Sequence, residues 1–353
     1  MNLENIKKLA LFVLVAASVS SGLSAQQTLS ATVYFDYSFN VTNDGYMTGT
    51  DAARSLDNKF TFRRAYFTYE NQISSSLKFR FRYDADNTGN IINAATSAKD
   101  DKLRPYIKHL YLEWSPGFVS SKFTIGMIET LDVKLEDDRW GYRSVAKTFL
   151  DIYKDVTGVD IDQTSADVGI SWKGALAKEL LFGAAVYNGA GYTHAENDKY
   201  KKLCGFLQLA PVSGFNIVGY MEYEDQNPTQ KAVLYFADVY VDLIPNLSIS
   251  GEWFTYDNDK HVNTDNSHFN VGGFSACGTY RIVPKKFNIF ARYDRYQPNS
   301  MDSSQSRGLL ILGADWFAWG SNARIQPNVW IYTYADSNKK RDAVFNLTFF
   351  LNF

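Results

Sequence analysis

Apolar and polar residues alternate with a period of two along much of the chain, most plainly at its C-terminal end. In residues 342–353, one set of alternate positions is apolar and the other set is polar. The apolar set is Ala343, Phe345, Leu347, Phe349, Leu351 and Phe353, and the polar set is Asp342, Asn346, Thr348 and Asn352. Successive side chains of a β-strand point to opposite faces, so this segment is predicted to be a strand with one apolar and one wet face.

The same alternation recurs upstream, with the charged residues consistently in the polar register. The clearest segments are 77–84, 215–224, 247–253 and 287–294. Short turns that contain Pro, Gly or Asn alternate with longer polar stretches, namely 41–58, 87–104, 257–267 and 298–305. Tight turns on one side and long loops on the other are typical of outer-membrane proteins. The chain is therefore predicted to be all-β, a transmembrane, antiparallel, up-and-down β-barrel of about 16 strands.

The composition fits a barrel better than a secreted soluble protein. Mean hydropathy is only −0.27, although aromatic residues make up 16% of the chain. Strands that face lipid on one side and water on the other keep the average low, and aromatic side chains gather at the membrane interfaces.

At the N-terminus, Lys7 and Lys8 precede an apolar stretch that ends in Leu-Ser-Ala, which is the pattern of a signal peptide. Residues 1–25 are therefore expected to be removed, leaving 26–353 as the barrel domain.

One connection, residues 131–163, is much longer than the others and is called the long loop below. It is the third long loop in the expected order, and a connection of this length in a compact protein is usually functional. Its charged residues of both signs include Lys134, Glu136, Asp137, Asp138, Arg139 and Arg143. If the long loop folds inward, it would constrict the pore, and its charges would set the electric field across the pore. The alternative is a solvated surface loop.

A row of basic residues is expected to line the pore. Lys78, Arg80 and Arg82 alternate with apolar residues and lie about 6.6 Å apart on one face of a strand. Arg64 on the preceding strand and Arg292 near the C-terminus occupy polar positions of the same kind. Rows of cations favour anions in a pore. The alternative is that they only balance carboxylates on neighbouring strands.

Several of these segments resemble the phosphate-selective porins O and P. The resemblance is carried by residues 62–65 (Phe-Arg-Arg-Ala), the strand at 77–83, residues 109–114 (His-Leu-Tyr-Leu-Glu-Trp), and Phe-Thr-Ile-Gly at 123–126 followed by Glu129. It is clearest over residues 60–130. The resemblance implies a sixteen-stranded homotrimeric pore with anion preference, in which Arg64, Lys78, Arg80 and Arg82 would contact the anion.

No catalytic motif, P-loop or zinc-binding set occurs in the sequence, so neither an enzyme nor a cofactor or metal is expected. With a formal net charge of −2, the chain also shows no sign of nucleic-acid binding. The expected function is an outer-membrane porin, a passive channel for small hydrophilic solutes with a preference for anions or phosphate. The alternatives are a barrel enzyme and a structural or adhesive barrel that does not conduct.

The expected partners follow from that function. They are the lipid and lipopolysaccharide of the bacterial outer membrane, the permeating solutes, and two further copies of the chain. A terminal Phe353 on an alternating strand resembles the insertion signal that the barrel assembly machinery reads.

Overall fold

The computed structural model describes residues 26–42, 58–86, 91–92, 99–100, 105–196 and 198–353. The expected signal peptide, residues 1–25, lies outside the described residues, as do 43–57 and most of 87–104. Within the described part, no helix is both long and apolar enough to cross a membrane.

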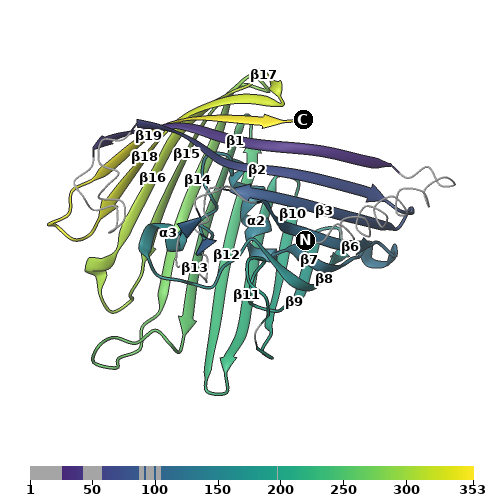
Figure 1. The fold of residues 1–353 in the computed structure, drawn as a ribbon, viewed down its shortest axis with the longest axis horizontal. Helices are drawn as coiled ribbons and strands as arrows, with labels where there is room; N and C mark the ends of the chain where they lie inside the picture. Colours follow the sequence, from purple (N-terminus) through teal and green to yellow (C-terminus); the bar gives the residue numbers. More distant parts are fainter. Residues whose placement is uncertain (1–25, 43–57, 87–90, 93–98, 101–104, 197) are drawn as a thin grey trace.

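Sixteen strands form one closed antiparallel sheet, as the alternation predicts (Figure 1). Around the barrel they are β1 (Gln27–Thr42), β2 (Asn58–Gln72), β3 (Leu77–Asp86), β6 (Pro105–Trp114), β7 (Lys122–Glu129), β8 (Ala166–Ala177), β9 (Leu180–Tyr187), β10 (Lys202–Val212), β11 (Phe215–Asn227), β12 (Gln230–Ile244), β13 (Leu247–Asn258), β14 (Val271–Val283), β15 (Phe287–Gln297), β16 (Arg307–Trp316), β18 (Ala323–Tyr334) and β19 (Asp342–Asn352). Outside this sheet lie the pair β4 (Ile91–Ile92) and β5 (Lys99–Asp100), the short β17 (Ala318–Ser321), and the 3₁₀ turns η2 (Phe118–Ser120) and η3 (Ser303–Gln305).

The two faces of the strands differ as their sequences predict. On β15, Ile289 and Tyr293 are 43% and 37% exposed on the outer face, whereas Arg292 and Asp294 are buried on the inner face at 1% and 0%. A slip of one residue in the pairing of strands would turn this charged pair toward lipid. The burial pattern therefore fixes the register.

Tight turns join the strands where Pro and Asn were noted in the sequence. The β12–β13 turn contains only Pro245 and Asn246, and the β14–β15 turn contains Lys285. Asn246 and Lys285 have φ angles of 62° and 61°. Pro245 fixes a negative φ at the first position of its turn, so only Asn246 is left-handed, and asparagine tolerates that conformation. The β14–β15 turn has three residues, 284–286, with Lys285 at its centre.

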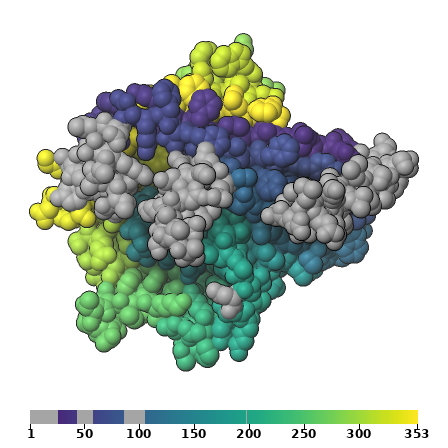
Figure 2. All heavy atoms as spheres, in the orientation of Figure 1, coloured from purple at the N-terminus to yellow at the C-terminus, as the bar shows by residue number. Residues whose placement is uncertain are grey.

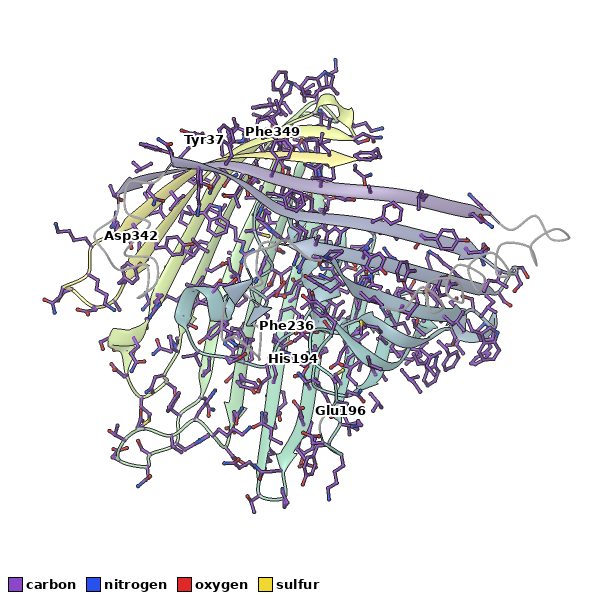
Figure 3. All side chains as sticks on the ribbon, in the orientation of Figure 1. Tyr37, His194, Glu196, Phe236, Asp342 and Phe349 are labelled. Carbon is purple, nitrogen blue, oxygen red and sulfur yellow. The ribbon has the colours of Figure 1, made fainter. Side chains whose placement is uncertain are left out.

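The barrel closes between its first and last strands. Phe353 donates a backbone hydrogen bond to Ala31 at 2.9 Å and accepts one from it at 2.6 Å. On the outer face of the same seam, the rings of Phe35 and Phe349 stack with their centres 4.8 Å apart. Figure 2 shows the first part of the described chain, in purple, beside the last part, in yellow, and Figure 3 labels Tyr37 and Phe349 on the paired strands. Closure leaves no unpaired sheet edge in the membrane.

The long loop folds into the barrel, as expected, and carries two helices, α2 (Leu131–Trp140) and α3 (Tyr153–Thr157), inside the ring of strands (Figure 1). Its apolar side chains form one buried cluster with inward-facing residues that come mainly from β9 to β16. The hydrophobic core of the protein is thus the contact between the long loop and one half of the barrel wall.

Candidate functional site

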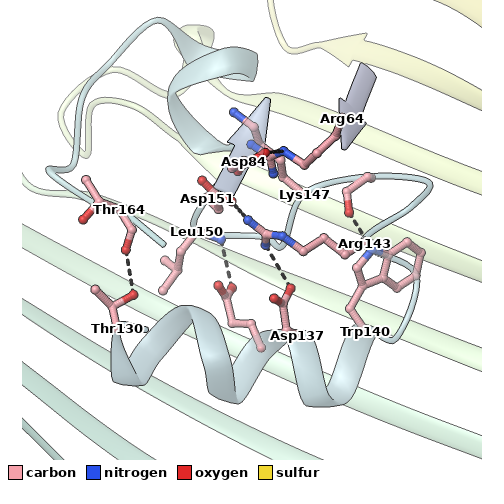
Figure 4. Close-up of polar contacts among 12 residues, drawn as sticks. Arg64, Asp84, Thr130, Asp137, Trp140, Arg143, Lys147, Leu150, Asp151 and Thr164 are labelled. Atoms are coloured by element: carbon pink, nitrogen blue, oxygen red, sulfur yellow. Dashed lines mark hydrogen bonds and ion pairs between the residues drawn. The ribbon is translucent and has the colours of Figure 1, made fainter. Parts of the chain in front are cut away.

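Local sequence signals set the course of the long loop. Thr130 precedes α2, and its hydroxyl donates to the backbone oxygen of Thr164 at 2.6 Å, which ties the two ends of the loop together (Figure 4). Gly141 ends α2 with φ 67°, a left-handed conformation that glycine adopts without strain. The chain turns back there, so the second half of the loop lies beside α2.

Aromatic packing fixes the second half of the loop to the wall. Phe149 lies 5.3 Å from Phe254 and 5.1 Å from Tyr296, measured between ring centres. Tyr153 contacts the same two rings at 5.3 and 5.2 Å. Gly273 makes room for this approach, since a Cβ atom there would lie 2.9 Å from the Phe149 ring. This side of the lumen is therefore filled with side chains.

Polar contacts hold the loop at other points of the wall. Ser144 donates to the side-chain oxygen of Gln326 on β18 at 2.6 Å. Arg63 on β2 donates to the backbone oxygen of Val145 at 2.7 Å. β18 adjoins β16 at the edge of the apolar contact, whereas β2 lies three strands further round the barrel, so the loop reaches across the lumen.

A cavity of about 270 Å³ remains between the loop and the wall on this second side. Its described lining has five cationic side chains and two carboxylates. The cations are Arg82, Lys108, Lys134, Arg143 and Arg324, and the carboxylates are Glu129 and Asp137. The cavity is therefore lined by an excess of positive charge.

Two β-bulges turn further cations toward the interior, and one of these cations, Lys108, lines the cavity. The pairing of β1 with β2 skips Arg63, and the pairing of β3 with β6 skips Lys108. An extra residue in a strand lets two consecutive side chains face the same side. Arg63 consequently reaches Asp36 at 2.8 Å, and Lys108 reaches Asp84 at 3.3 Å, both inside the barrel.

Sequence reasoning missed Arg63 and Lys108 because strict alternation assigns them to the outer face. A signal was present in the sequence, since each belongs to a pair of consecutive polar residues, Arg63-Arg64 and Lys108-His109, in the middle of an alternating strand. Two adjacent polar residues in such a strand indicate a bulge.

The carboxylates that pair with these cations lie deeper in the wall. Asp84 is fully buried and lies 3.3 Å from both Arg64 and Lys108. Asp315 is likewise buried and lies 2.9 Å from Arg324. The predicted residue Arg82 hydrogen-bonds Thr68 at 2.8 Å, and within the described residues no ion pair to it is seen. Lys108 and Arg324 thus line the cavity in front of their buried counter-ions.

Besides Arg64, which pairs with Asp84 and does not line the cavity, two more of the predicted basic residues have partners on neighbouring strands, which is the alternative that the sequence left open. Lys78 lies 2.8 Å from Glu70, and Arg80 lies 3.5 Å from the same carboxylate and 3.6 Å from Glu129. Arg80 also donates to the Tyr111 hydroxyl at 3.2 Å. Both face the interior, but neither lines the cavity described above.

Arg292 differs from the expectation. It faces the interior, but the long loop covers it and leaves it 1% exposed. Its guanidinium binds both oxygens of Asp294, and it donates to the backbone oxygen of Lys147 at 2.7 Å. Arg292 therefore holds the loop in place and does not border the cavity.

The charged residues of the long loop divide between the cavity and the wall. Arg143 lines the cavity and lies 2.9 Å from Asp137, with Asp151 on its other side (Figure 4). Burial raises the pKa of Asp151, but Arg143 and Lys147 outweigh this and bring its pKa down to about 2. Asp151 therefore remains charged at neutral pH.

The other predicted loop residues point elsewhere. Asp138 is exposed and paired with Lys134, whereas Arg139 reaches Asp238 on β12 at 3.0 Å. Glu136 is fully buried against the wall and accepts a hydrogen bond from the Leu150 backbone. Of the three consecutive acidic residues, Glu136 is therefore withdrawn from the cavity. Within the described residues, no group of three or more His, Cys, Asp or Glu side chains has the geometry of a metal site.

No protein-family model and no curated protein sequence matches the chain. Solved structures share its fold. The anion-selective porin from Comamonas acidovorans matches with a TM-score of 0.67 at 10% identity, over 94% of this chain and 100% of that one. The outer membrane channel DcaP of Acinetobacter baumannii matches with a TM-score of 0.65 at 12% identity, over 94% and 99%.

A trimer form of OmpT, an outer membrane protein of Vibrio cholerae, matches with a TM-score of 0.61 at 12% identity, over 94% of this chain and 100% of that one. These likenesses place the chain in the fold class of the sixteen-stranded barrels of the bacterial outer membrane.

Proposed function

We propose that this chain is a porin of the bacterial outer membrane, a passive channel that favours small anions. The observation that carries the proposal is the cavity beside the long loop, where five cations and two carboxylates line the space that the loop leaves open. Cationic linings favour anions in a pore. Low-dielectric walls focus the field of such charges into a narrow passage.

The position of the counter-ions supports anion preference. Asp84 and Asp315 lie behind their cations and are buried in the wall, so a permeating solute meets the guanidinium and ammonium groups first. Screening by salt acts over about 8 Å at physiological ionic strength. Charges that border a narrow cavity therefore act on the solute more strongly than charges at the barrel ends.

We include inorganic phosphate among the proposed solutes. A guanidinium group offers paired donors that match the oxygens of phosphate, and Arg82, Arg143 and Arg324 all border the cavity. The resemblance to the phosphate-selective porins over residues 60–130 agrees with this choice. Assembly as a homotrimer, cleavage of residues 1–25 and insertion through the signal at Phe353 belong to the same proposal.

Reversal potentials of the reconstituted barrel in a KCl gradient test the proposal. The wild-type barrel is expected to conduct in defined steps and to favour chloride. The Arg82→Gln/Lys108→Gln double variant should shift the reversal potential toward cation preference. Arg64 remains in that variant to hold Asp84, which keeps the buried carboxylate paired.

Arg281→Gln is the matched control because Arg281 pairs with Asp242 at the end of β14, away from the cavity. It should leave the reversal potential unchanged. A silent bilayer would contradict the pore, and a wild-type barrel without chloride preference would contradict the anion selectivity. A double variant that behaves like the wild type would remove Arg82 and Lys108 from the selective site.

A further inference from the structure

Helix α2 presents two carboxyl groups to the barrel wall. Asp132 and Glu136 are four residues apart, so they lie on the same face of the helix, one turn from each other. They are 1% and 0% exposed. No ion pair to either is found among the described residues, although the same helix has ion-paired charges on its other sides.

Glu136 meets another carboxyl group, that of Glu252 on β13. One Glu136 oxygen accepts from the Leu150 backbone at 2.9 Å, and the Glu252 carboxyl group is near enough to interact electrostatically with that of Glu136. Each keeps one oxygen that is buried without a hydrogen-bond partner. The other charged or titratable groups around this pair are Asp238 with its partner Arg139, Arg292 with its partner Asp294, and Cys277.

Asp132 faces Glu222 on β11. Lys202 lies 2.9 Å from Glu222 and 3.9 Å from Glu224, and it also interacts electrostatically with Asp132. One ammonium group therefore offsets the charge of three carboxylates. Glu222 also accepts hydrogen bonds from Tyr220 and from Gln163 of the long loop. Cys204 and Tyr187 complete the titratable surroundings.

Two carboxylates that meet in a buried interface cannot both ionise at low energetic cost, because desolvation and mutual repulsion both favour a shared proton. Burial, followed by the charge of Glu222, raises the pKa of Asp132 from its ordinary value to about 7. Burial, followed by Glu252, raises the pKa of Glu136 well above its ordinary range.

We propose that Asp132 and Glu136 act as a proton-dependent clasp that holds α2 against β11 and β13, and that loss of their protons releases the helix from the wall. Because α2 also supplies Lys134 and Asp137 to the cavity lining, release changes the passage. Only this effect on conduction rests on the proposed function. The movement of the helix does not.

The direction of the pH effect follows from proton binding. A carboxyl group with a raised pKa binds its proton more tightly when the helix is attached than when it is solvated. The attached state is therefore favoured most below the ordinary pKa and loses that advantage as the pH rises toward the raised value. For each group, the ratio of attached to released loop falls by up to about tenfold per pH unit in this window.

Two native thiols can report the release. Cys204 on β10 and Cys277 on β14 are free, face inward and are buried near the two carboxyl pairs. The rate at which a small charged thiol reagent labels them in the folded barrel measures how often the loop exposes the wall. The ionisation of the thiols also changes the labelling rate with pH. This effect cancels when the labelling rates of two variants are compared at the same pH.

The test variant is Asp132→Asn/Glu136→Gln, which keeps the shape of both side chains and removes their ionisation. Asp138→Asn is the matched control, because Asp138 lies on the same helix but is exposed and paired with Lys134. Between pH 6 and pH 9, the labelling rate of the wild type relative to the test variant should rise by about tenfold or more. The Asp138→Asn barrel should follow the wild type.

Equal pH profiles for the wild type and the test variant would overturn the clasp, whatever the channel conducts. If the double variant fails to assemble into a folded barrel, Glu252→Gln tests the same pair from the wall side. A Glu252→Gln profile identical to the wild-type profile would also overturn the proposal. Channel recordings over the same pH range then show whether release alters conductance, and a silent channel would count against the proposed function alone.

Discussion

Replacing Phe149 with alanine should loosen the long loop without unfolding the barrel. Phe149 is 1% exposed and packs between the rings of Phe254 and Tyr296, at the centre of the contact between loop and wall. Truncation of a buried phenylalanine to alanine costs about 3 to 5 kcal/mol, because apolar contacts are lost and a cavity is left. The hydrogen bonds between strands do not involve this side chain. The lost free energy therefore weakens the attachment of the loop and leaves the barrel stable.

A loss of this size corresponds to a change of roughly two to three and a half powers of ten in the ratio of attached to released loop. Hydrogen exchange of the backbone amides in residues 142–158 is the direct assay. Exchange there should accelerate strongly, while the amides of β9 to β16 should keep their protection. Channel recordings should show a larger and noisier open state.

Phe345→Ala is the matched control, since Phe345 lies on the outer face of β19 and is 37% exposed. It makes the same chemical change without touching the loop. Unchanged exchange in the Phe149→Ala loop would refute the reasoning, because it would show that this aromatic contact does not hold the loop. Equal acceleration in the Phe345→Ala barrel would refute it too, because the effect would then be general.

Two further predictions concern the barrel itself. Phe81→Lys should destabilise the barrel by about 2 to 4 kcal/mol, because Phe81 lies halfway along β3 on the lipid-facing side. Lys78→Gln should cost at most about 1 kcal/mol, because it removes only a partly exposed ion pair, and equal urea midpoints for the two variants would contradict the register. Deletion of Phe353 should lower the amount of folded barrel in the outer membrane, because it removes both backbone hydrogen bonds to Ala31 and an exposed aromatic ring at the seam. An unchanged gel shift of the folded form on heating would argue against a role for this residue in assembly.

The sequence allowed the strand pattern to be predicted because alternation is a local property. Each strand carries its own apolar and polar faces, as Ile289 and Arg292 show on β15, and each turn carries its own signal, as Asn246 does. The number of strands follows from these local units. The length of residues 131–163 likewise indicated the one connection able to fill the lumen.

One signal in the sequence was informative about the loop but could be interpreted only with the structure. Residues 308–314 are uncharged and apolar at most positions of both faces. In the barrel, Leu309 and Ile311 face inward, are fully buried and belong to the same core cluster as the long loop. An inner face that is apolar marks the part of the wall that the loop covers.

Tertiary structure decided which charged side chains face the lumen. Alternation predicts that Arg63 and Lys108 face outward, but strand pairing inserts a bulge at each and turns both inward. Arg292 shares its polar register with the expected pore-lining residues, yet the loop buries it against Asp294. A residue's own neighbours in sequence predict the face on which it lies, except where strand pairing inserts a bulge. Whether that face meets solute, a counter-ion or the loop depends on residues elsewhere in the chain, such as Lys147 for Arg292, and only the folded barrel brings them together.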